Sequence, residues 1–115
     1  MTELVLRLQF NYLSKLIDRI YKIIPLKEEK IQTVNSYIDS IIDEVMGNAD
    51  LINSIDCDPR VMIIVSTLSS IKNTEEHDVY KRSVFKCIRY VEQLRDVVSE
   101  EISKCEMRGR SMINF

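Results

Sequence analysis

The sequence predicts an all-α protein, a four-helix bundle with mostly up-down connections and a long C-terminal helix. Three stretches of the chain carry apolar residues at alternating spacings of three and four, the pattern of a helix with one buried face. The three apolar stripes are Leu6, Phe10, Leu13, Ile17, Ile20 and Ile24; Ile31, Val34, Ile38, Ile41 and Val45; and Tyr80, Val84, Cys87, Val91, Leu94 and Val98. Two glycines and two prolines in 115 residues are too few turn residues for a sheet of many strands. Because the stripes have only one another to pack against, we expect one helical domain over residues 1–115.

The first two helices are predicted to form an antiparallel hairpin. The first covers residues 2–24, with Thr2 as its N-cap, and Pro25 is expected to end it because the residue before a proline avoids helical backbone angles. The second covers residues 27–46 and ends at Gly47. A connection of one or two residues leaves room only for a reversal of direction.

A third helix is predicted to start at Asp58-Pro59, an N-cap followed by a proline at the first helical position. Residues 61–65 are apolar on every side, which fits a helix buried all round or a strand. The cap and the apolar residues Leu68 and Ile71 favour the helix. Helical spacing of apolar residues between positions 48 and 57 leaves open a short extra helix before the third.

The fourth helix is predicted from Thr74 to Met107 or Arg108, with Gly109 as its end. Asn73 and Thr74 are both N-cap residues, and Asn73 with Glu76 forms a capping-box-like pair. At about 1.5 Å per residue this helix would be about 50 Å long, well beyond the length of the third. Its C-terminal part therefore needs cover from the first two helices or from a partner chain.

The overall composition argues against several classes of protein. The net charge of −2 gives no general attraction to nucleic acid or acidic membranes. No apolar run approaches the ~20 residues of a membrane span, and no signal-peptide cleavage site follows the N-terminus. Ala49 is the only alanine, whereas Ile, Lys and Asn abound, a composition typical of AT-rich genomes such as those of Firmicutes, phages and viruses. We expect a soluble cytoplasmic protein, in the host cytoplasm if the chain is viral.

No metal, cofactor or catalytic centre is expected from the residue pattern. Cys57, Cys87 and Cys105 form no Cys-x-x-Cys pair, and the single histidine, His77, lies twenty residues from the first of them. We interpret the cysteines as reduced thiols. A phosphate-binding Gly-rich loop and the Glu-x-x-His pair of di-iron bundles are both missing from the sequence. The chain is therefore not expected to be an enzyme.

His77 supports one alternative function. With Lys81 one turn later, it loosely resembles the phosphotransfer domains, which present a reactive histidine and a nearby lysine on a four-helix bundle. Tyr80 and Arg82 stand where those domains carry small residues, so the resemblance is incomplete. An ordinary surface histidine near a helix start is the competing interpretation.

Two basic stripes support another alternative, binding of anions or nucleic acid. They are Lys15, Arg19 and Lys22 on the first helix, and Arg82, Lys86 and Arg89 on the last. Tyr21 and Tyr90 are the aromatic residues that could stack on bases. The competing interpretation is a salt-bridged face, because Asp18 lies beside the first stripe and the second helix offers Asp39, Asp43 and Glu44. Nucleic acid is therefore not the expected partner.

The C-terminal tail, residues 110–115, is too apolar to be left free in solvent. It either folds back on the bundle or packs against a neighbour. The candidate self-association surface combines the tail with the end of the last helix, and consists of Val98, Ile102, Cys105, Met112, Ile113 and Phe115. The sequence thus predicts a non-enzymatic helical interaction protein (an adaptor, an inhibitor or an immunity-type factor) that binds a protein partner and forms a homodimer.

Overall fold

The computed structural model describes the backbone of residues 3–48 and 59–113, and side chains up to residue 108. Within these ranges every regular element is a helix, and the all-α prediction is confirmed. The elements are α1 (Glu3–Tyr21), α2 (Ile23–Glu28), α3 (Val34–Asn48), α4 (Pro59–Lys72) and α5 (His77–Ile113). Asn48 ends α3, and the rest of the segment considered for a short extra helix, residues 49–57, lies with the Asp58 cap outside the described residues.

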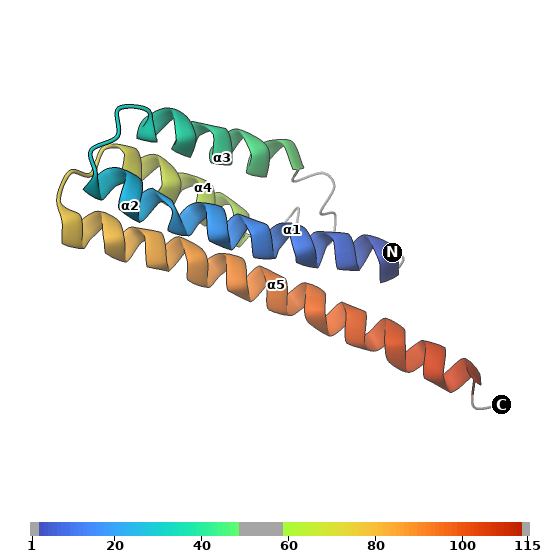
Figure 1. Cartoon of the computed structure of the whole chain (residues 1–115). Helices are drawn as coiled ribbons and strands as arrows, with labels where there is room; N and C mark the ends of the chain where they lie inside the picture. The colour runs from blue at the N-terminus through green and yellow to red at the C-terminus, as the bar shows by residue number, and fades with distance from the viewer. Residues whose placement is uncertain (1–2, 49–58, 114–115) are drawn as a thin grey trace.

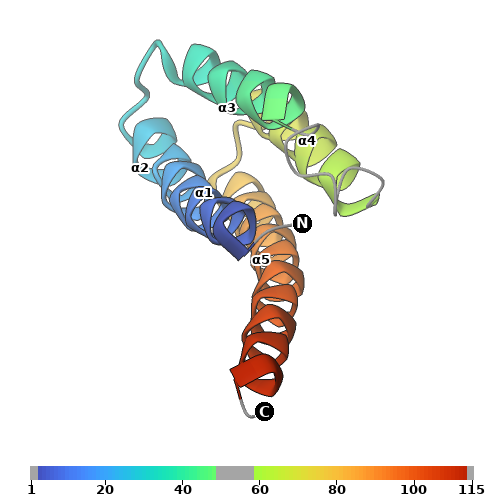
Figure 2. The same ribbon diagram turned by 90° about the vertical axis from the view of Figure 1, so that its right-hand side faces the viewer.

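The long helices form an up-down bundle. Figure 1 shows α1 and α4 running in one direction and α3 and α5 in the other, with α2 continuing the line of α1. Viewed from the end of the bundle, α5 lies at the corner opposite α3, with α1 and α4 on either side of it (Figure 2). Helix α5 packs mainly against α1 and α4, and α3 packs mainly against α4. The molecule is elongated, 61 Å by 22 Å by 20 Å, because α5 continues beyond the other helices.

The predicted apolar stripes form the core. All six residues of the α5 stripe are buried. The first predicted stripe is buried apart from Phe10 of α1 and Ile24, which lies in α2; both are partly covered and pack against the core. In α3 the buried residues are Ile38, Ile41 and Val45. Helix α4 adds Ile64, Leu68 and Ile71. The helices therefore bury the faces that their sequence periodicity indicates.

The prediction that Pro25 ends the first helix is wrong. Helix α1 ends at Tyr21, and α2 begins at Ile23 and contains Pro25 in its first turn, where the chain needs no N–H donor from the proline. The second long helix begins at Val34 rather than at residue 27. The turn between them contains Lys30 with a positive φ of 53°, and Ile31 lies in this turn, 36 % exposed and outside the core stripe.

Residues 61–65 lie within α4, so they are helical and do not form a strand, but the helix is not buried all round. Met62 is 66 % exposed, and only Ile64 of this stretch is fully buried. After α4, Thr74 donates its hydroxyl to the carbonyl of Ser70 at 2.8 Å. Thr74 therefore closes the end of α4 and does not cap α5.

Helix α5 is shifted and longer than predicted. It begins at His77, and the carbonyl of Glu76 accepts the N–H groups of Val79 and Tyr80. The capping box predicted for Asn73 and Glu76 is therefore wrong. Gly109 does not end the helix, which continues to Ile113, so that its 37 residues extend over about 55 Å.

Candidate interaction surface

The inner stripe of α5 is largely used within the chain. Val98 of the candidate self-association surface is fully buried within the chain and packs in its core. Ile102 and Cys105 are partly buried and pack against the core. Arg7 of α1 pairs with Glu106 at 2.6 Å, which shows that α1 accompanies α5 to this level. The side chains of Met112 and Ile113, and the whole of Phe115, lie outside what the structure describes.

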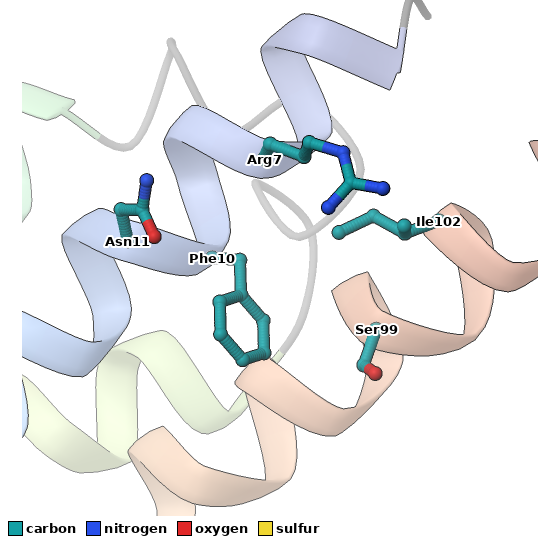
Figure 3. Close-up of a pocket in the computed structure, with 5 residues that line it drawn as sticks. All are labelled: Arg7, Phe10, Asn11, Ser99 and Ile102. Carbon is teal, nitrogen blue, oxygen red and sulfur yellow. The ribbon is translucent and has the colours of Figure 1, made fainter.

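A shallow groove of about 300 Å³ separates α1 from α5 near this end. It is lined by Arg7, Phe10, Asn11, Ser99 and Ile102, and Figure 3 shows these side chains on the two facing helices. The guanidinium of Arg95 lies 5.7 Å from the centre of the Phe10 ring and covers one side of it. The lining includes neither a carboxylate nor an imidazole, so the groove provides no general acid or base.

The structure divides the first predicted basic stripe and leaves the second one exposed along its whole length. Arg19 turns toward α3, where it forms an ion pair with Glu44 and lies 5.9 Å from the ring centre of Tyr37. The first stripe is thus divided, and Lys15 and Lys22 are its exposed members. The second stripe is intact, since Arg82, Lys86 and Arg89 are all exposed on the outer face of α5. The salt-bridged interpretation therefore holds for Arg19 and not for the α5 stripe.

An exposed aromatic pair joins α1 and α5 beside the basic residues of α5. The rings of Tyr21 and Phe85 are 5.8 Å apart in an edge-to-face arrangement, and the two residues are 43 % and 42 % exposed. Sequence reasoning named Tyr21 with Tyr90 and missed Phe85. The signal was present, because Phe85 lies off the apolar stripe, one helical turn from both Lys81 and Arg89.

His77 lies at the end of the bundle opposite the Phe10 groove, in a small pocket of about 280 Å³ with Glu28 and Tyr80. Its Nε2 atom is 2.8 Å from the Glu28 carboxylate and its Nδ1 atom is 3.5 Å from Asp78. The hydrogen bond that His77 donates to the Glu28 carboxylate raises the pKa of His77 above its ordinary value. The carboxylates of Glu28 and Asp78, beside the two ring nitrogens, would repel an incoming phosphoryl group. Lys81, the lysine of the phosphotransfer interpretation, forms no ion pair among the described residues.

The described residues contain no cluster of three potential metal ligands. Cys87 is buried, and burial raises the pKa of its thiol to about 12, so it remains protonated at neutral pH. Cys105 is partly exposed, and Cys57 lies outside the described residues. Among residues 3–48 and 59–113, no helix has the length and hydropathy of a membrane-spanning segment.

Comparison of the chain with protein-family models, with curated proteins and with solved structures gave no match. The candidate sites are therefore judged on their own chemistry. The outer face of α5 carries the exposed residues Arg82, Lys86 and Arg89, which form no ion pair among the described residues, beside the exposed ring of Phe85.

Proposed function

We propose that the protein is a non-enzymatic, cytoplasmic interaction protein that associates with a second copy of itself along α5. The observation that carries this proposal is the length of α5 relative to its neighbours. Arg60, near the start of α4, reaches Gln93 at 3.5 Å, so α4 accompanies only the first half of α5. The second half of α5 has α1 on one side, and Figure 2 shows it continuing away from the bundle.

The chemistry of the pockets supports a binding role rather than a catalytic one. The groove at Phe10 has no acid or base, and the His77 pocket holds its imidazole in an exposed ion pair with Glu28. Neither pocket combines a nucleophile with an activating base, the arrangement that covalent catalysis needs. A helix of about 55 Å that extends past its neighbours is instead suited to pairing with another helix.

Sedimentation over a range of protein concentrations tests the proposal. We expect a monomer–dimer equilibrium in the micromolar range. Native mass spectrometry of an equal mixture of unlabelled and isotope-labelled chains should then show a mixed dimer beside the two pure ones. A chain that remains monomeric at the highest concentration would overturn self-association.

A further inference from the structure

The outer face of α5 carries one continuous polar stripe, opposite the buried one. It is formed by Asp78, Arg82, Lys86, Arg89, Gln93, Asp96, Glu100 and Lys104. The spacings along the helix are four, four, three, four, three, four and four, so these side chains share one face over about 39 Å. All are exposed except Gln93, which is partly covered.

The order of charges along this stripe is antisymmetric about position 91, because charged residues equally far before and after it carry opposite charges. Reading from the start, the stripe is acidic, then basic three times, then neutral, then acidic twice, then basic. If a second α5 lies antiparallel against this face, with a twofold axis beside Val91, each residue faces a complementary one. The facing pairs are Asp78 with Lys104, Arg82 with Glu100, Lys86 with Asp96, and Arg89 with Gln93. The symmetry repeats each pair, so three kinds of opposite-charge contact occur six times.

Within a single chain this order places like charges one helical turn apart at two points of the stripe. Arg82 and Lys86, one turn apart, repel each other, and so do Asp96 and Glu100. None of these four residues takes part in an ion pair among the residues that the structure describes. An isolated surface helix is stabilised when opposite charges alternate at this spacing. The i,i+4 pairs Asp78–Arg82 and Glu100–Lys104 offset part of this repulsion, and a second copy offers an opposite charge to each of the four residues.

Apolar contacts and open space accompany the charges. Phe85, on the flank of the stripe, is 42 % exposed, and Met107 at its end is 66 % exposed. Helices α1 and α4 pack on the inner sides of α5 (Figure 2), and α4 reaches the edge of the outer stripe where Arg60 donates to Gln93. A second helix can thus approach this face without displacing any element of the bundle.

We infer that two copies of the chain pair through the outer faces of α5, antiparallel, with the twofold axis beside Val91. This inference deepens the proposed function and depends on it. The same basic residues, Arg82, Lys86 and Arg89, could contact phosphates instead, but Asp96 and Glu100 continue the same stripe and would repel a nucleic acid laid along it. The acidic half of the stripe therefore favours a second copy.

Charge reversal tests the pairing. Arg82→Glu turns two attractive contacts of the dimer into two repulsive ones, and Glu100→Arg does the same, so each should weaken dimerisation by about tenfold or more. Combining both changes in one chain should restore the dimer. Mixing the two single variants should also restore it, because the mixed dimer regains both contacts. Lys15→Glu, the same change of charge on the exposed face of α1, is the matched control and should leave dimerisation unchanged.

A cross-linking measurement gives the register directly. Carbodiimide should join Lys86 of one chain to Asp96 of another, and an isotope-mixed sample identifies such links as intermolecular. Within one helix these residues are about 15 Å apart, beyond the reach of a zero-length cross-linker.

The outcomes separate the inference from the proposed function. A wild-type monomer at every concentration overturns both. A dimer that tolerates Arg82→Glu, or single variants that fail to rescue each other when mixed, overturns the register while self-association stands. Tight nucleic-acid binding that is lost in Arg82→Glu and strengthened in Glu100→Arg, without a dimer, assigns the basic residues to phosphate contacts and overturns the pairing.

Discussion

Replacement of Leu94 by alanine provides a quantitative test of the core. Leu94 lies on the inner stripe of α5, near the level where α4 begins, and its side chain is 2 % exposed. Removing most of a buried leucine side chain costs about 2–5 kcal/mol, the sum of the lost transfer free energy and the cavity left behind. A domain of this size has a total stability of about 5–15 kcal/mol, so the change removes a large fraction of it.

The matched control is Leu8→Ala, because Leu8 is the same residue type but is 60 % exposed on α1. An exposed position of this kind should change the free energy of unfolding by no more than about 0.5 kcal/mol. With about 3 kcal/mol lost, Leu94→Ala should lower the melting temperature by about 10–15 °C. Urea denaturation and thermal melts at low protein concentration, where association adds little, measure both variants.

A stronger perturbation, Leu94→Asp, places an unpaired carboxylate in the core at a cost of several kcal/mol and should abolish folding. Equal losses of stability in Leu94→Ala and Leu8→Ala would refute the position of the core. A folded Leu94→Asp variant would do the same.

Three further predictions concern individual side chains. NMR titration should give His77 a pKa above its ordinary 6.5, and Glu28→Gln should lower that pKa; the stabilisation from the ion pair is present below pH 6.5 and is lost as the pH rises through the raised pKa. Acetyl phosphate should leave the His77 ring unmodified, and an acid-labile phosphate on it would contradict its interpretation as an ion-paired surface histidine. Peptide mapping after brief alkylation of the folded protein should find Cys105 modified well before Cys87, whose thiol is buried with its pKa raised to about 12; equal rates would contradict the packing of α5 against α4. Binding to single-stranded nucleic acid should be weak and should disappear at physiological salt, and tight, salt-resistant binding lost in Arg82→Glu would contradict it.

Which residues lie in the core was predictable from periodicity. The α5 stripe from Tyr80 to Val98 is buried at every position, because a helix that packs on one side must place its apolar residues three and four apart. The errors were at the ends of helices. Pro25 entered a helix through its first turn, and Gly109 stayed within α5, because both residues shift helix boundaries by small free energies that neighbouring turns can outweigh.

Most of the candidate sites depended on spatial relations that spacing alone does not report. Arg19 and Lys22 share a stripe in the sequence, yet Arg19 turned to Glu44 because α3 lies on that side of α1. His77 met Glu28 across 49 positions of the chain. The edge-to-face contact of Tyr21 with Phe85 also joins two helices that are remote in sequence.

The sequence by itself determined that the chain forms amphipathic helices, which face of each helix is buried, and the charge order along the outer face of α5. These are properties of one helix at a time, set by side-chain type and a period of 3.6 residues. Only the tertiary structure decided how far each helix is covered by its neighbours. Val98 became core because α1 runs antiparallel to α5 as far as Glu106, whereas the outer stripe stayed exposed because each neighbouring helix covers only the side it packs against.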